Sequence, residues 1–190
     1  MSIPLFLLAN AEDQTLQDAQ CLVLSAVAFE RLLAPSQSKS LTLACAFDDA
    51  LKDRSTKKLA SSPKVVLDHD PKFSTEQGSW SIAKKWIKEL YEVRSAEVHR
   101  GQNKQLSSNW SYRQHMVISA FAFPLVAKKL LQSAGHYELQ KLDEVRLDVL
   151  DDLLLSDWGD GRFKEPEWPS IISDEQVSRE IRQAIFRALK

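Results

Sequence analysis

Glycine and proline are scarce in this chain of 190 residues, with only five and seven copies. Leucine, alanine, lysine, glutamate and glutamine dominate the long runs instead, and all five are strong helix formers. Strands therefore have little room, since their connections are rich in turn residues. The composition predicts an all-α protein.

Cysteine is also rare, with only Cys21 and Cys45 in the whole chain. Both lie in apolar helical patterns, which favours buried thiols in a reducing compartment over a bond joining two helices. The apolar opening IPLFLLA (residues 3–9) is too short to span a membrane, and no basic flank precedes it as in a secretory signal. We therefore expect a cytoplasmic protein with no membrane partner.

Motifs for metals and phosphate-bearing cofactors are missing as well. His69, His115 and His136 lie far apart, with no cysteine or carboxylate at metal-ligand spacing. The chain also has no glycine-rich phosphate loop and no nucleophile elbow. We expect neither a metal nor a cofactor.

Apolar periodicity predicts one helical domain over residues 15–190, a bundle of about six helices. Residues 1–14 are then an N-terminal segment or the tail of an upstream domain. Residues 61–79 contain two prolines, a glycine and several serines, and we expect a loop there. The expected helices begin near Thr15, near Ser38 or Ser40, at Trp80, at Trp110, at Glu138 and near Ser173.

Proline and glycine mark several expected helix ends. Pro35 ends the first helix, and Gly135 closes the helix that begins at Trp110. Inside that helix, Pro124 should cause a bend around residues 120–123 or a restart of the helix there. The next helix is expected over residues 138–157.

The stretch WSIAKKWIKELYEVRSAEVHRG (residues 80–101) is the one around which we expect the fold to be organised. Ile82, Trp86, Leu90 and Val93 fall at the four-four-three spacing of one helix face. This pattern predicts a buried amphipathic helix, and Gly101 is placed to stop it.

Arg94 and His99 lie near the end of this helix. A guanidinium holds phosphate oxygens by paired hydrogen bonds, and histidine titrates near neutral pH. Glu30 lies inside an apolar run of the first helix, where a carboxylate needs a cation or an exit to water, so we predict that it lies close to Arg94. The plainer alternatives are a surface arginine, a histidine at the negative end of the helix dipole, and a solvated Glu30.

The segment LYEVRSAEVHRG (residues 90–101) resembles the signature of HEPN domains, in which an arginine, a polar residue and a histidine lie near the end of a helix. Tyr91, the pair Arg94 and Ser95, and the His-x-Gly ending are similar to the ApeA-like branch found in bacterial defence proteins. The segment AFERLL (residues 28–33) resembles part of an earlier helix in that branch. The resemblance covers about residues 15–131.

The resemblance implies an all-α, HEPN-like bundle that forms a homodimer and often acts as a metal-independent endoribonuclease, a hydrolase of antiviral defence or toxin systems. Cleavage of RNA without a metal needs a base for the ribose hydroxyl, an acid for the leaving oxygen and a cation over the phosphate. His99 suits the role of base or acid, and Arg94 suits the phosphate. The rival interpretation is a non-catalytic HEPN-like module for dimerisation or sensing in a larger protein.

Helix geometry constrains how Arg94 and His99 meet. Residues five apart are rotated by about 140° on a regular helix, so the two side chains do not share a face. Either the helix breaks near Val98, or two copies of the chain bring one motif against the other. Ser95 does share a face with His99 and could hydrogen-bond it, whereas Tyr91 is expected in the core or at an interface.

Positive charge is concentrated around the motif. Residues 81–113 hold seven basic side chains against three acidic ones, a surplus of four. This surplus favours an RNA partner, with phosphate contacts expected from Lys84, Lys85, Lys88, Arg100 and Lys104. We also expect a homodimer, because the apolar stripe around Trp86 and Tyr91 exceeds what a single neighbouring helix covers.

Overall fold

A computed structural model describes most of the chain between residues 18 and 155: residues 18–37, 39–52, 54, 56–62, 65–67, 74–98, 108–148 and 150–155. These residues contain no strand, only an isolated antiparallel bridge between Lys58 and Ser81. The all-α prediction is confirmed. The elements are α2 (Asp18–Leu33), α3 (Ser40–Ala50), the short 3-10 helix η1 (Leu59–Ser61), α4 (Ser74–Gln77), α5 (Ile82–Val98), α6 (Tyr112–Ser133), α7 (Lys141–Asp148) and α8 (Leu150–Leu155).

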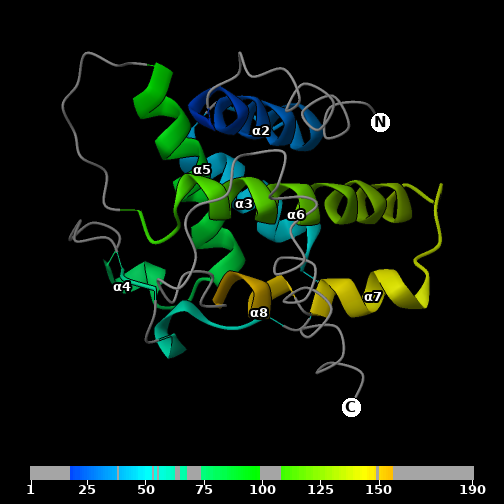
Figure 1. The fold of residues 1–190 in the computed structure, drawn as a ribbon. Helices are drawn as coiled ribbons and strands as arrows, with labels where there is room; N and C mark the ends of the chain where they lie inside the picture. Colours follow the sequence, from blue (N-terminus) through cyan, green and yellow to red (C-terminus); the bar gives the residue numbers. More distant parts are fainter. Residues whose placement is uncertain are drawn as a thin grey trace, which may run out of the picture.

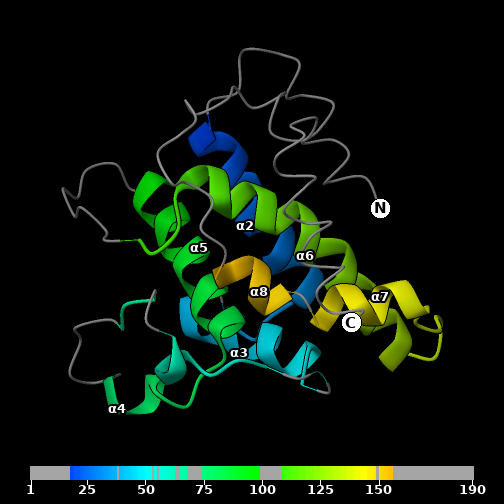
Figure 2. The same ribbon diagram turned by 60° about the horizontal axis from the view of Figure 1, so that its bottom comes forward.

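Helix α5 occupies the centre of the described bundle. It packs against α2, α3 and α8, while α6 packs against α2, α3, α7 and α8 (Figures 1 and 2). The fully buried indole of Trp86 lies 5.8 Å from the ring of Phe29 on α2 and 5.7 Å from that of Phe47 on α3, both edge to face. Edge-to-face pairs of this kind add to the burial of apolar area, so the aromatic contacts fasten α5 to both neighbours.

Helix α6 has well-formed ends. Ser111 and Gln114 form a reciprocal capping box at its start. At its end Gly135 has φ +74°, and the His136 N–H donates to the Leu131 carbonyl at 2.8 Å, which is the six-to-one bond of a Schellman motif. The prediction that Gly135 closes this helix is confirmed.

Pro124 does not restart α6, which continues through it as one helix. Proline removes one backbone donor and leaves the carbonyl four residues earlier without its partner. Pro124 and Ala120 are both exposed, so water can reach that carbonyl. Among the described helices, α6 is also the one long and apolar enough to cross a membrane by length and composition, a test that a core helix passes as well.

Three other expectations differ from the structure. Ser40 does not cap α3, because the N-cap position is Lys39; the Ser40 hydroxyl donates to Glu92 on α5 at 3.3 Å. The expected loop 61–79 contains the short helix α4. In the expected helix 138–157, residues 138–140 lie outside the helix, and α7 and α8 lie on either side of residue 149, which is outside the described residues.

Some expectations fall outside the described residues. These are the cap at Thr15 and the alternative cap at Ser38, the stop at Gly101 and the helix after Ser173. The two cysteines are both described, and both are free thiols, Cys21 buried and Cys45 half-buried. The alternative, a disulfide bond between Cys21 and Cys45 that joins two helices, is therefore not present.

The start of α7 is fixed by the buried carboxyl of Asp143. It accepts hydrogen bonds from Lys128 Nζ at 2.6 Å, from the Tyr137 hydroxyl at 2.8 Å and from the Gln140 N–H at 3.3 Å. Burial by itself raises the pKa of Asp143, but these hydrogen bonds outweigh it and hold the pKa below its ordinary value of 3.8. The contact with Asp143 raises the pKa of Lys128 above its ordinary 10.5.

Replacing Asp143 by asparagine should therefore lower the free energy of unfolding at pH 7 by about 1–3 kcal/mol, because Lys128 loses its charged partner. A carboxyl group whose pKa is lowered in the folded state stabilises the fold at pH values above its pKa in the unfolded state. The difference between wild type and Asp143→Asn should be complete above pH 3.8 and shrink as the pH falls below it. Urea unfolding at several pH values measures this difference.

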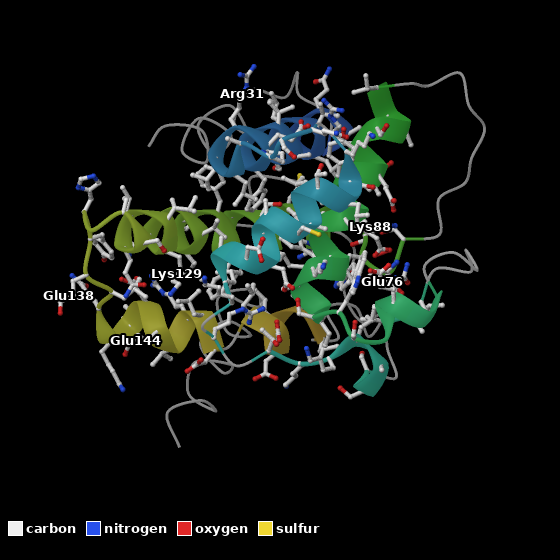
Figure 3. All side chains as sticks on the ribbon, turned by 180° about the vertical axis from the view of Figure 1, so that it is seen from behind. Arg31, Glu76, Lys88, Lys129, Glu138 and Glu144 are labelled. Atoms are coloured by element: carbon white, nitrogen blue, oxygen red, sulfur yellow. The ribbon has the colours of Figure 1, made fainter. Side chains whose placement is uncertain are left out.

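The matched control is Asp148→Asn, which removes an exposed carboxyl from the same helix and should leave the stability nearly unchanged. In Figure 3, Glu138 just before α7 and Glu144 on α7 point away from the bundle. Equal stability of Asp143→Asn and Asp148→Asn at pH 7 would contradict a role for Asp143 in holding α7.

Candidate functional site

Arg94 lies on α5, opposite the last turn of α2. Its Nη2 atom is 3.5 Å from Oε2 of Glu30, and the two side chains are 23% and 13% exposed. The prediction that Glu30 lies close to Arg94 is confirmed. The two residues meet because α2 packs against α5, so a carboxylate in an apolar run of α2 finds a cation on the neighbouring helix.

Tyr91 forms the second side of the arginine site. The Cζ atom of Arg94 lies 5.3 Å from the centre of the Tyr91 ring, one turn earlier on α5, which is within the range of a cation–π contact. Tyr91 is itself buried, as expected for a core residue. The guanidinium is thus held by a carboxylate and by an aromatic ring, while its Nε atom has no hydrogen-bond partner in the part of the chain that the structure describes.

The remaining motif residues are only partly described. His99, Arg100 and Lys104 lie outside the described residues, so the distance between Arg94 and His99 is not defined. Ser95 is described and half-buried on the last turns of α5. The expected neighbourhood of Ser95 and His99 therefore stays a prediction.

The lysines of α5 were expected to face RNA phosphates, but they occupy other environments. Lys85 and Lys88 are buried, with 0% and 6% exposure, and Lys88 Nζ forms an ion pair with Glu92 at 2.7 Å. Lys84 is half-buried over the ring of Trp80, at 4.8 Å from its centre. The expectation of a phosphate-facing patch must be corrected for Lys85 and Lys88, because α5 is enclosed by its neighbours and formal charge along the sequence does not give exposure.

The apolar stripe of α5 is also enclosed within one chain. Trp86 is fully buried and Tyr91 nearly so, with α2, α3 and α8 packed around α5. The expectation that this stripe needs a second copy is therefore wrong, since several helices cover it rather than one. The predicted homodimer then depends on the geometry of Arg94 and His99 alone.

Glu89 and Asn109 form a contact that the sequence interpretation missed. The buried carboxylate of Glu89 accepts from the Asn109 backbone N–H at 2.9 Å and from its side-chain amide at 3.0 Å. The side-chain amide of Asn109 also accepts a hydrogen bond from the Val66 N–H at 2.7 Å and donates one to the Val66 carbonyl at 3.2 Å. The rule applied to Glu30, that a carboxylate among apolar helix residues needs a partner, also applies to Glu89 and could have identified it.

Glu97 on the last turn of α5 accepts a hydrogen bond from the Tyr112 hydroxyl at the start of α6. Together with Asn109, this contact fixes the region where the chain returns to the bundle after the undescribed residues 99–107. No group of three or more histidine, cysteine, aspartate or glutamate side chains suited to a metal ion is found in the described part of the chain.

The fold and the site define an all-α bundle with a partly exposed arginine near the end of its central helix. Comparisons of the chain with protein families, with curated proteins and with solved structures found no match. The functional interpretation therefore depends on the residues themselves.

The ion pair of Glu30 and Arg94 can be tested by a double-mutant cycle with Glu30→Gln and Arg94→Gln. Because both side chains are mostly buried, we expect a coupling energy of about 0.5–1 kcal/mol in urea unfolding. The exposed pair of Lys57 and Asp152 serves as the control cycle and should give a smaller coupling. A coupling of zero between Glu30 and Arg94 would show that Glu30 does not hold the guanidinium.

Proposed function

We propose that the end of α5 is the RNA phosphate site of a HEPN-like, metal-independent endoribonuclease or RNA-binding effector of a bacterial defence or toxin system. The observation that carries this proposal is the placement of Arg94, which is oriented by Glu30 and Tyr91 yet keeps 23% of its side chain exposed. A guanidinium held in this way loses little further freedom when it binds an anion. The resemblance of residues 90–101 to the HEPN motif supports the same interpretation.

The proposed roles follow from the chemistry of each side chain. Arg94 binds the non-bridging oxygens of the scissile phosphate and stabilises the charge that builds there. His99 takes the proton from the ribose hydroxyl or returns a proton to the leaving oxygen. Glu30 orients the guanidinium, and Ser95 supports the imidazole.

Two copies of the chain are part of this proposal. Along a regular helix, Arg94 and His99 project in directions about 140° apart. A twofold axis near the end of α5 would bring Arg94 of one copy toward His99 of the other and form two equivalent sites.

The dimer is tested by light scattering over a range of protein concentrations. The expected mass is twice that of the 21.6 kDa chain at high micromolar concentration. A variant with Val98→Asp should favour the monomer, because Val98 is exposed at the end of α5 and a charge there would oppose close approach of the two copies. A wild type that remains monomeric throughout would contradict a site built from two copies.

A second candidate, the non-catalytic dimerisation or sensing module, is favoured by one observation. Glu30 already neutralises much of the charge of Arg94, and the ammonium group of Lys88 on the same helix is paired with Glu92. In that case the arginine serves the packing of α2 on α5 and no RNA is cleaved. Dependence of cleavage on His99 separates the two candidates.

Cleavage is tested by gel analysis of mixed cellular RNA. His99→Ala should lower the cleavage rate by about two to four orders of magnitude, because the proton transfers lose their donor and acceptor. Arg94→Lys should also lower it, since lysine keeps the charge but lacks the planar fork. Cleavage by the wild type should persist in a chelator, and a DNA copy of the substrate should resist because it lacks the ribose hydroxyl.

The matched controls are His136→Ala, which removes an exposed imidazole after α6, and Arg31→Lys, which changes an arginine that points outward from α2 (Figure 3). Both should cleave like the wild type. Equal cleavage by wild type and His99→Ala would identify a contaminating nuclease. No cleavage by any of them, with RNA binding retained, would favour the non-catalytic module.

A further inference from the structure

Three buried polar atoms lie on neighbouring side chains of α5 and α6. They are Nε1 of Trp86, Nδ1 of His115 and Oγ of Ser119, and none of them has a hydrogen-bond partner among the described residues. The rings of Trp86 and His115 lie 6.4 Å apart between their centres. Ser119 follows His115 by four residues on α6, so the two side chains share one helix face. Buried polar groups in native proteins are nearly always satisfied, so this cluster calls for a partner.

The hydrogen bonds around His115 define its tautomer. Nε2 lies 3.2 Å from the hydroxyl oxygen of Ser108, and that hydroxyl is 2.7 Å from the Trp110 carbonyl. A hydroxyl has one proton, and here it is donated to the carbonyl. The Ser108 oxygen must therefore accept from His115, which puts the ring proton on Nε2 and leaves Nδ1 as a bare acceptor.

The charge state of His115 agrees with this assignment. The ring is fully buried between Trp86 and Trp110, whose centres lie 6.4 Å and 6.2 Å from it. Desolvation by burial lowers the pKa of His115 from 6.5 to about 3. The imidazole is neutral at physiological pH, with one nitrogen that donates and one that accepts.

We propose that one buried water molecule bridges Trp86 Nε1, His115 Nδ1 and Ser119 Oγ and so links α5 to α6. The three groups are complementary to water, because the indole can only donate, the bare Nδ1 can only accept and the serine hydroxyl can do either. A buried water typically makes about three hydrogen bonds to groups that would otherwise be unsatisfied. The indole and imidazole are neighbours, yet no direct hydrogen bond joins their nitrogen atoms.

This water site is separate from the arginine site and does not depend on the proposed function. Arg94 lies eight residues after Trp86 on α5, and neither Glu30 nor Tyr91 belongs to the polar cluster. The water would hold the faces of α5 and α6 together through polar contacts, at a point where large aromatic side chains also fill the space between the helices.

The site is tested by NMR on the full-length chain labelled with nitrogen-15. We expect the indole N–H of Trp86 to show a nuclear Overhauser cross peak with water in both rotating-frame and laboratory-frame experiments. The two cross peaks should have the opposite signs that identify a long-lived bound water. Long-range proton–nitrogen spectra should show His115 protonated at Nε2. Absence of the water cross peak in wild type, or a proton on Nδ1, would overturn the proposal.

Two serine variants provide the matched comparison. Ser119 and Ser25 are both 5% exposed and lie within helices, but the Ser25 hydroxyl already donates to the Cys21 carbonyl at 2.9 Å. Ser119→Ala should weaken or remove the water cross peak at Trp86, and Ser25→Ala should leave it unchanged. An unchanged peak in Ser119→Ala would overturn a site with three partners. Circular dichroism establishes that both variants are folded, and the wild-type spectra test the proposal independently of them.

Discussion

The burial of Trp86 is the constraint on which the rest of the described structure depends. Its indole contacts aromatic rings from α2 and α3, and the imidazole of His115 from α6 lies beside it. A side chain this large at a junction of four helices fixes their spacing, because well-packed cores tolerate little change of volume. The centre of α5 is consequently enclosed, and the end of the helix is left as the place where its polar side chains can meet a partner.

Enclosure of α5 forces its charged side chains into defined pairs, since an unpaired buried charge is costly. Lys88 pairs with Glu92, which also receives the Ser40 hydroxyl from α3. Glu89 binds Asn109 at the start of the segment that leads into α6. Arg94 differs from these residues because it pairs with Glu30 at the edge of the bundle and stays partly exposed, which is why it is the best candidate for an external anion.

Periodicity and the position of Gly135 predicted α5 and the end of α6, and the rule on buried carboxylates predicted the contact of Glu30 with Arg94. Both predictions depend on information within one helix or on the chemistry of one side chain. The burial of Lys85 and Lys88 could not be predicted, because it depends on how many helices enclose α5. The start of α7 at Lys141 rather than at residue 138 was missed for a related reason: the apolar pattern does not show tertiary contacts such as that of Asp143 with Lys128 on α6.

The central claim is that Arg94 contacts RNA phosphate, and side-chain NMR of the arginines tests it most directly. A short RNA with methylated ribose hydroxyls cannot be cleaved and can be titrated into the labelled protein. The guanidinium signals of Arg94 can be assigned by their loss in Arg94→Lys. The account predicts that the chemical shifts of these signals change as RNA is added, while those of the outward-pointing Arg31 do not. Binding of the RNA without any shift of the Arg94 signals would contradict it.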